Sequence, residues 1–348
     1  TSEFGAFAAA VAKRYSGKVS YYALWNEPNI GKTWLTPRYG RAKGVGRYDY
    51  AAAKYRQLYR AGYKSIARYD RARRNKVLFG ETAAIGAPTD FIRAALCLDT
   101  RGNAFRGRRA KVQGCSGRVA KLNTLGFAVH PYNSGGNGTP RSKTSSRNAL
   151  PIAYMPRLTR IIDGAARHRR IARGRGIYVT EFGFQSRPPD TFSNVSLTEQ
   201  GQYINESDRL LFGASRVKWV AQYELTDVPQ KDQFNSGLRF VGGRLKPAYG
   251  AYRMPIVVTR RSANSVEVYG QIRPGGRSTV AIQAQASGSS FKTVKNVRTN
   301  SRGVFRLNIS KKKAFRLKWR LSAMSPVTGN AITSRTAIAG RKLGFYRN

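Results

Sequence analysis

Two glutamates in this chain, Glu27 and Glu181, each follow an apolar run with strand character and open a polar loop. The runs cover residues 19–25 and 176–180. Paired carboxyl groups at strand ends suit the cleavage of a glycosidic bond. One carboxyl protonates the leaving oxygen, while the other, still ionised, attacks or stabilises an oxocarbenium-like centre. The sequence therefore predicts that Glu27 and Glu181 are catalytic.

Acidic residues are scarce in this chain, which makes their positions informative. The 348 residues include 63 Lys and Arg but only 17 Asp and Glu. Three further acids, Glu81, Glu224 and Asp227, also stand where an apolar run stops. This arrangement indicates an acidic site. For Glu81 and Asp227, an ordinary surface ion pair with one of the many arginines is an equally good interpretation.

The net charge of +46 is spread along the whole sequence, with basic clusters at residues 71–74, 106–109, 167–170 and 311–313. Such a surface attracts polyanions in a salt-dependent way, and acidic polysaccharides or anionic cell-wall polymers are attracted as nucleic acid is. Because no nucleic-acid-binding motif accompanies the charge, we expect no specific nucleic-acid partner. An arginine bias throughout the source proteome would produce the same charge.

The two cysteines, Cys97 and Cys115, flank a basic, glycine-bearing stretch that has the composition of a loop. A disulfide would close this loop in an oxidising compartment, and two unpaired thiols are the alternative. No signal peptide is visible in the chain. We expect an extracellular or cell-surface protein.

No apolar stretch approaches the roughly 20 residues that cross a bilayer, so we expect no membrane span. The two His and two Cys lie far apart in the sequence and lack the spacing of metal ligands. Neither a metal nor a cofactor is expected, since the two-carboxylate chemistry needs none.

Strand-like runs alternate with helical patterns over residues 1–255, which is typical of repeated βα units around a parallel sheet. The predicted strands are 19–25, 77–81, 125–132, 176–184 and 217–224, and the predicted helices are 4–15, 50–69, 91–98, 155–170 and 198–212. A complete (β/α)8 TIM-type barrel has eight strands in about 250 residues. The pattern therefore predicts a partial barrel.

The pattern changes over residues 256–348, where short alternating runs are separated by turn residues. Strands are predicted at 265–269, 278–282, 303–307 and 315–319. Several short strands with regular turns predict a small all-β, Ig-like sandwich domain. This segment holds 19 Lys and Arg but a single acid, Glu267. It cannot host two-carboxylate chemistry, and we expect a spacer or a surface-binding module.

The Trp-Asn-Glu-Pro-Asn motif at 25–29 resembles the acid/base motif at the end of strand four in clan A glycoside hydrolases, which include β-xylosidases, iduronidases and many endoglycanases. The Thr-Glu-Phe-Gly motif at 180–183 is similar to their nucleophile motif at the end of strand seven. The two glutamates are 154 residues apart, which leaves room for two strands between them. The resemblance covers residues 1–255 and implies strands four to eight of the barrel, without strands one to three.

This resemblance assigns roles to five residues of the chain. Glu27 would be the general acid/base and Glu181 the nucleophile of a retaining double displacement. Asn26 would direct its amide at the sugar 2-hydroxyl. His130 and Tyr132, at the end of the strand that resembles strand six, would hydrogen-bond the nucleophile or the substrate.

Aromatic side chains near the strand ends are candidates for sugar stacking. Trp25 is one, and Tyr223 with Glu224 stands close enough to a strand end to contact substrate. A core position is the usual fate of an aromatic residue on a barrel strand, and we favour it for Trp219.

The predicted function is that of a retaining O-glycoside hydrolase that cleaves a β-linkage in a poly- or oligosaccharide. The alternative is a noncatalytic protein that binds carbohydrate or an anionic cell-wall polymer, derived from a glycosidase and held to its ligand by positive charge. Because catalysis needs Glu27 protonated and Glu181 ionised, any activity should have a bell-shaped pH profile.

Overall fold

The computed structural model describes residues 1–348 except 32–34, 134–137, 194, 231–232 and 347–348. Its first part is built on a five-stranded sheet in the order β1-β4-β5-β6-β7, with every neighbouring pair parallel. The strands are β1 (Tyr22–Ala23), β4 (Val77–Ala83), β5 (Gly126–His130), β6 (Gly176–Phe182) and β7 (Val217–Gln222). The predicted partial barrel is therefore confirmed as a parallel β/α half-barrel.

Helices alternate with these strands, and polar caps begin two of them. Asp49 accepts the Ala52 N–H at the start of α2, and Ser196 with Glu199 forms a capping box on α6. The helices are α1 (Ser2–Arg14), α2 (Tyr50–Tyr69), α3 (Pro88–Ala95), α4 (Gly107–Val112), α5 (Met155–Arg167), α6 (Leu197–Phe212) and α7 (Pro247–Arg253), with short 3-10 turns η1 (Arg71–Arg73) and η2 (Ile152–Tyr154). Helix α4 and α7 were not predicted.

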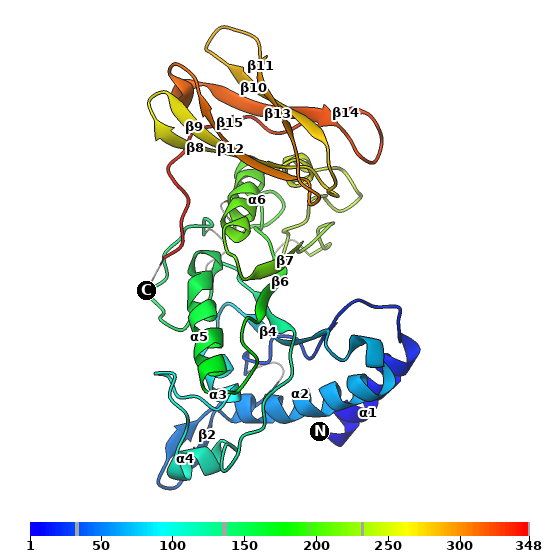
Figure 1. Ribbon diagram of the computed structural model, residues 1–348, viewed down its shortest axis with the longest axis vertical. Helices are drawn as coiled ribbons and strands as arrows, with labels where there is room; N and C mark the ends of the chain where they lie inside the picture. The colour runs from blue at the N-terminus through cyan, green and yellow to red at the C-terminus, as the bar shows by residue number, and fades with distance from the viewer. Residues whose placement is uncertain (32–34, 134–137, 194, 231–232, 347–348) are drawn as a thin grey trace.

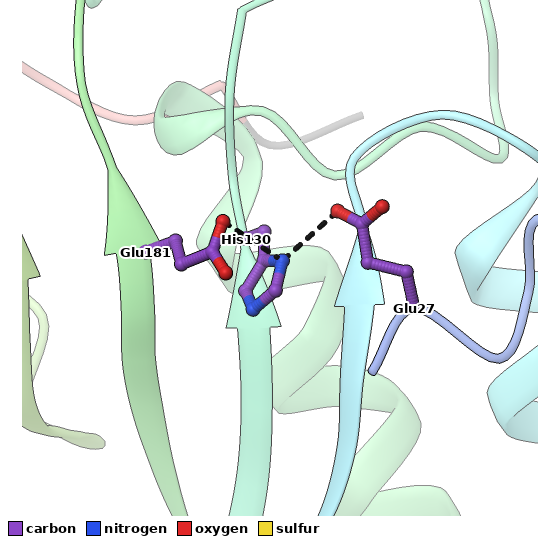
Figure 2. Close-up of side chains that lie close together, drawn as sticks. All are labelled: Glu27, His130 and Glu181. Carbon is purple, nitrogen blue, oxygen red and sulfur yellow. Dashed lines mark hydrogen bonds and ion pairs between the residues drawn. The ribbon is translucent and has the colours of Figure 1, made fainter. Parts of the chain in front are cut away.

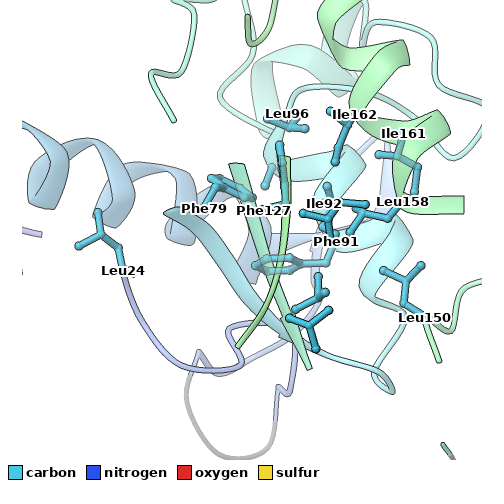
Figure 3. Packing of buried hydrophobic residues seen from close by; sticks show 14 of the residues in the cluster. Leu24, Phe79, Phe91, Ile92, Leu96, Phe127, Leu150, Leu158, Ile161 and Ile162 are labelled. Atoms are coloured by element: carbon cyan, nitrogen blue, oxygen red, sulfur yellow. The ribbon is translucent and has the colours of Figure 1, made fainter. Parts of the chain in front are cut away.

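The strands alternate their side chains between two environments, as the period of two requires. Phe79 and Phe127 face the helices, where their ring centroids lie 5.2 Å apart within the main buried cluster (Figure 3). Leu78, Ala128 and Tyr178 form a separate buried cluster on the other face of the sheet. The helices therefore cover one face, and the other lines the inside of the half-barrel.

Two antiparallel sheets follow and lie at one end of the molecule (Figure 1). One has the order β12-β9-β8, and the other has β11-β10-β13-β14 with β15 beside β13. They share one buried cluster around Trp319. The strands are β8 (Ile256–Ser262), β9 (Ser265–Gln271), β10 (Thr279–Gln285), β11 (Lys292–Arg298), β12 (Val304–Ser310), β13 (Lys318–Met324), β14 (Ala331–Thr333) and β15 (Ala337–Ile338).

Several predicted boundaries were wrong. The first strand, predicted over 19–25, pairs only at Tyr22–Ala23, and Trp25 already has a left-handed φ of 74°. The strand predicted over 315–319 starts later, because a 3-10 turn, η3 (Ala314–Arg316), precedes β13. The β2–β3 hairpin (Gly40–Ala42 and Gly46–Tyr48) was missed because its strands are short and polar.

Charged pairs join the antiparallel sheets to helix α6. Arg209 lies 2.6 Å from Glu267, and Arg273 lies 2.8 Å from Asp208. Asn205 accepts the backbone N–H of Ile256 at 3.1 Å. Glu267, the one acid of the C-terminal segment, therefore helps to attach this segment to helix α6. Among the described residues, no helix has the length and apolar character that would let it cross a membrane.

Cys97 and Cys115 form a disulfide with a sequence separation of 18. Replacing both with Ala should lower the free energy of unfolding by about 3 kcal/mol, because the reduced unfolded chain regains loop entropy. Urea unfolding of the two proteins, both without reductant, measures the difference. Dithiothreitol should lower the stability of the wild type alone, and an equal effect on the double variant would contradict the prediction.

Candidate active site

Glu27, His130 and Glu181 meet at the carboxyl-terminal edge of the parallel sheet (Figure 2). Glu27 follows β1, His130 ends β5 and Glu181 lies near the end of β6. The Nδ1 atom of His130 lies 2.9 Å from Oε1 of Glu27 and 3.4 Å from Oε2 of Glu181. His130 is fully buried, whereas both carboxylates are partly exposed. The imidazole therefore contacts both carboxylates on their buried side, and solvent reaches the carboxylates on their exposed side.

The spacing of the two carboxylates bears on the reaction they can perform. One oxygen of each glutamate and a ring nitrogen of His130 all lie within 4.8 Å of one another. Retaining glycosidases place their carboxyl groups about 5 to 5.5 Å apart, and inverting enzymes leave about 6.5 to 9.5 Å for a water molecule. The short separation fits direct attack by a carboxylate.

A β-bulge in β4 holds Glu27 in place. The register between β4 and β5 shifts between Gly80 and Thr82, which leaves Glu81 outside the ladder. The freed carbonyl of Glu81 accepts the backbone N–H of Glu27 at 2.9 Å. Glycine is required beside the bulge, since Gly80 has φ 101° and a Cβ there would lie 2.7 Å from the Ala128 carbonyl oxygen. Glu27 and Glu81 have φ values of 42° and 71°, a strained region for such residues.

Asn29 fastens the loop that follows Glu27 to the end of β4. Its buried side chain donates to the carbonyls of Ile85 at 2.6 Å and Ala83 at 3.3 Å. It also accepts the backbone N–H of Ala83 at 2.9 Å. The sequence motif contained this asparagine, but its positioning role follows only from the contacts.

Glu181 has a second polar neighbour, Tyr132, whose hydroxyl donates to Oε2 at 3.1 Å. Burial raises the pKa of Glu181, the imidazole of His130 and the Tyr132 hydrogen bond lower it, and the charge of Glu27 raises it. The net pKa lies above the ordinary glutamate value. Burial likewise raises the pKa of the Tyr132 phenol, which therefore remains a hydrogen-bond donor at neutral pH.

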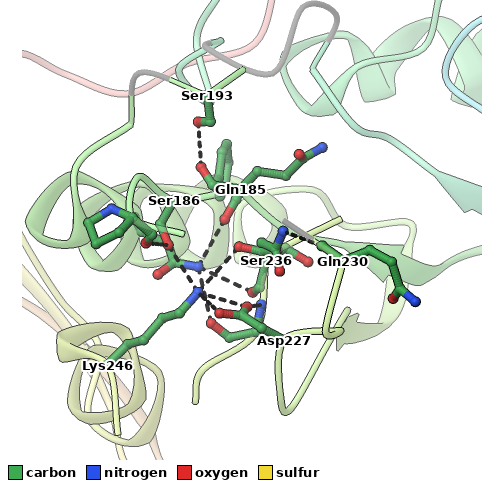
Figure 4. A network of polar contacts seen from close by, with 12 residues as sticks. Gln185, Ser186, Ser193, Asp227, Gln230, Ser236 and Lys246 are labelled. Atoms are coloured by element: carbon green, nitrogen blue, oxygen red, sulfur yellow. Dashed lines mark hydrogen bonds and ion pairs between the residues drawn. The ribbon is translucent and has the colours of Figure 1, made fainter. Parts of the chain in front are cut away.

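The other acids at strand ends lie in two different places. Glu81 interacts electrostatically with Glu27 and Glu181, and burial raises its pKa against the opposing effect of His130. Burial also raises the pKa of Glu224. Asp227 forms a fully buried ion pair with Lys246, with Oδ2 2.7 Å from Nζ (Figure 4). The surface arginine pair considered for Asp227 is therefore excluded.

A pocket of about 240 Å³ opens beside Glu27. Phe234 lines it, with its ring centroid 5.8 Å from that of Tyr132 and 6.0 Å from that of Tyr223. Phe234 is 49% exposed, so it presents an apolar surface to a ligand. The pattern around residue 234 contains no strand or motif, so sequence reasoning missed it.

Two of the predicted site residues face another hollow. The Trp25 ring packs edge-on against Phe4, with centroids 5.4 Å apart, and Asn26 lines the same apolar groove as Trp25. Their assigned roles stay predictions. Trp219, predicted to be core, is 44% exposed and lies 5.6 Å from the Tyr21 ring inside the half-barrel.

The cluster of Glu27, His130 and Glu181 also offers three ligand atoms that suit a divalent cation. Their separation in the sequence concealed this set, because three different strands bring the residues together. A cation bound there would occupy the same carboxylate oxygens that the sequence predicts to be catalytic.

No family model matches the sequence, and no curated protein matches it. Solved structures do match. A GH128 (subgroup II) endo-β-1,3-glucanase from Pseudomonas viridiflava aligns with a TM-score of 0.41 and 18% identity, covering 71% of this chain and 74% of that protein. The alignment with β-glucuronidase 2 of Bacteroides uniformis has a TM-score of 0.29, 10% identity and 83% coverage of this chain, but only 37% of the enzyme.

A putative β-galactosidase from Bacteroides fragilis aligns with a TM-score of 0.31 and 11% identity, over 82% of this chain and 44% of that protein. The chain is similar in structure to these glycosidases.

Proposed function

We propose that this protein is a retaining O-glycoside hydrolase that cleaves a β-glycosidic bond in a poly- or oligosaccharide by double displacement. The observation that carries the proposal is the close approach of Glu27 and Glu181 at one edge of the sheet, with His130 against both. The β-configuration of the substrate rests on the resemblance of the two glutamate motifs to clan A enzymes.

In the first step, a carboxylate oxygen of Glu181 attacks the anomeric carbon while Glu27 gives its proton to the departing glycosidic oxygen. The bond to the aglycone breaks, and a covalent glycosyl ester forms on Glu181. In the second step, Glu27 takes a proton from water, the water oxygen attacks the anomeric carbon, and Glu181 is released as a carboxylate. Tyr132 stabilises the ionised Glu181 before attack and after release.

The raised pKa of Glu181 sets the acid limit of this reaction. Attack requires the ionised carboxylate, and protonation removes it as the pH falls through that pKa. Because burial moves the pKa above the ordinary glutamate value, activity should begin to fall at a higher pH than for an exposed glutamate. The expected profile is bell-shaped, with its alkaline limit set by deprotonation of the general acid.

Replacing Tyr132 with Phe should shift the acid limb of the profile of kcat/KM toward higher pH. The Tyr132 hydroxyl lowers the pKa of Glu181, whereas burial raises it. Removing the hydroxyl should therefore raise the pKa of Glu181 further. The maximum of kcat/KM should fall by about tenfold, the cost of a lost hydrogen bond to a charged group. Tyr203→Phe, on helix α6, is the matched control. An acid limb that does not move would show that Tyr132 does not bind the ionised nucleophile.

The direct test is incubation with a panel of 2-deoxy-2-fluoro glycosyl fluorides, followed by intact-protein mass spectrometry and peptide mapping. These compounds form the ester but hydrolyse it slowly, so an adduct on Glu181 is expected with at least one sugar. The sugar that labels also identifies the glycone. The absence of any adduct on a chain shown by circular dichroism to be folded would contradict the proposal.

The net charge of +46 favours a second candidate, a noncatalytic protein that binds carbohydrate or an anionic cell-wall polymer. Such a protein would bind its polymer equally well with Glu181→Gln, and the affinity would fall steeply with salt. Binding of this kind without covalent labelling would support the second candidate over the hydrolase.

A further inference from the structure

A second hollow lies away from Glu27 and Glu181. A pocket of about 850 Å³ is enclosed by the β2–β3 hairpin, helix α3, the disulfide-closed loop and the end of helix α5. Among the described residues, it shares no lining residue with the pocket beside Glu27. Its walls are therefore available to a ligand that does not occupy the catalytic site.

Aromatic rings and arginines alternate on the wall of this pocket. The Tyr39 ring is 37% exposed, and the guanidinium groups of Arg47 and Arg38 lie 4.4 Å and 5.1 Å from its centroid. Arg109, which also lines the pocket, lies 5.7 Å from the ring centroid of Phe105. A ring face beside a guanidinium matches a sugar that carries an acidic group, since the ring packs on C–H bonds and the guanidinium pairs with the anion.

The carboxylates of the pocket are already engaged within the protein. Asp49 pairs with Arg38 at 2.8 Å and caps helix α2. Asp90 accepts from the Asn148 side chain at 2.7 Å, and Asp99 accepts two backbone N–H groups of its own loop. Burial also raises the pKa of Asp49 to about 6, against the effect of Arg38. Asp90 also pairs with Arg93 at 3.5 Å, so Asp49 and Asp90 each have an arginine partner outside the set Arg47, Arg106 and Arg109, whereas Asp99 is held by neutral donors and keeps its charge.

The arginines, in contrast, are free to pair with a ligand. In the part of the chain that the structure describes, Arg47, Arg106 and Arg109 form no ion pair with a carboxylate. Arg47 and Arg106 are exposed, whereas Arg109 donates to the carbonyls of Arg47 at 2.8 Å and Val45 at 3.4 Å. Arg47 packs its guanidinium against the Tyr39 ring, so its N–H groups rather than its face are left for a ligand.

Contacts within the protein fix the walls of the pocket without a ligand. The Cys97–Cys115 disulfide closes one wall, and the buried Gln113 side chain donates to the Asp49 carbonyl at 2.7 Å. The bonds from Arg109 join helix α4 to the hairpin. A site whose walls are fixed in this way loses little conformational entropy when it binds a ligand.

We propose that this pocket is a second saccharide site, which binds a sugar unit bearing a carboxylate through Arg47 and Arg106 with Tyr39 as the stacking surface. That the ligand is a saccharide rests on the proposed function, while the need for an anion rests on the arginines alone. The site would hold an acidic polysaccharide on the enzyme while another part of the chain reaches Glu27 and Glu181.

The test is isothermal titration calorimetry with trigalacturonic acid, with maltotriose as a neutral probe and inorganic phosphate as an anion without a sugar. The Glu181→Gln background prevents hydrolysis during the titration. Trigalacturonic acid should bind more tightly than either other probe. Arg47→Ala with Arg106→Ala should raise its Kd by about tenfold or more, as expected for two lost charge-assisted contacts.

The matched control is Arg298→Ala with Arg302→Ala, which removes the same charge from an exposed part of the antiparallel sheets. It should leave the Kd within about twofold of the unmodified background, since long-range charge effects are screened by salt. Equal losses in both pairs would overturn the proposal by showing that net charge alone attracts the ligand. Tyr39→Leu, which keeps all charge, should weaken trigalacturonic acid but not phosphate.

Two further results would also overturn the site: equal binding of maltotriose, or phosphate binding as tight as trigalacturonic acid. Covalent labelling of Glu181 in the Arg47→Ala, Arg106→Ala protein with Glu181 intact keeps this test separate from the proposed function. Normal labelling with lost trigalacturonic acid binding supports both ideas. Absent labelling with arginine-dependent binding contradicts the hydrolase and leaves the pocket supported.

Discussion

Replacing Glu181 with Gln is expected to lower kcat by about 10⁴- to 10⁶-fold, the loss seen when a covalent nucleophile is removed. Gln has nearly the same shape and can still accept the Tyr132 hydrogen bond, so the fold and the substrate KM should change little. What disappears is the negative charge that attacks the anomeric carbon. Initial rates on the aryl glycoside of the sugar that labels the enzyme measure the effect, and Glu3→Gln, an exposed glutamate, is the control.

Glu27→Ala should behave differently, because its role depends on the leaving group. General acid catalysis contributes about 10²- to 10⁴-fold for a poor leaving group. A dinitrophenolate leaves without a proton, so the first step on its glycoside should be nearly unimpaired and the glycosyl ester should accumulate. Azide, which needs no general base, should restore turnover. Equal losses on good and poor leaving groups would contradict the assignment of Glu27 as the acid.

Much of the half-barrel was predictable because its elements carry strong local signals. Helix α2 was predicted over 50–69 and spans Tyr50–Tyr69, since Asp49 caps it and apolar residues recur at helical spacing. Strands β4, β5 and β6 were found because they are mostly apolar runs, as buried parallel strands are. Strand β11 was missed because it is an edge strand rich in Lys, without alternation.

The site could be predicted only as far as its glutamates and their strands. That His130 touches both carboxylates depends on the register of β5 between β4 and β6, including the bulge at Glu81. A bulge arises from pairing between strands, so one strand's sequence does not reveal it. Trp219 was wrongly predicted to be core. In a closed barrel, an aromatic side chain on the inner face of a strand is buried, but the inner face of this half-barrel leaves the Trp219 ring exposed.

Asp227→Ala is expected to reduce the free energy of unfolding by about 3 to 5 kcal/mol, the usual cost of leaving a buried charge without its partner. Both Asp227 and Lys246 have fully buried side chains, and Nζ of Lys246 also donates to Ser186 Oγ at 2.9 Å. Figure 4 shows this ammonium among several polar groups. Urea unfolding at 25 °C measures the loss. Asp163→Ala, which breaks the partly exposed pair with Arg216, should cost about 1 kcal/mol or less.

Replacing both partners at once, as Asp227→Leu with Lys246→Met, should cost much less than Asp227→Ala alone. Burial raises the pKa of Asp227 and lowers that of Lys246, and in each case it is the largest effect, exceeding the attraction of the partner. Both shifts favour the neutral forms, so the pair does not recover the full cost of removing two charges from water. Apolar replacements avoid that cost, and such swaps are often neutral or stabilising. A double variant as unstable as Asp227→Ala would instead assign the stability to the Lys246 contacts with Ser186 and the Asn235 carbonyl.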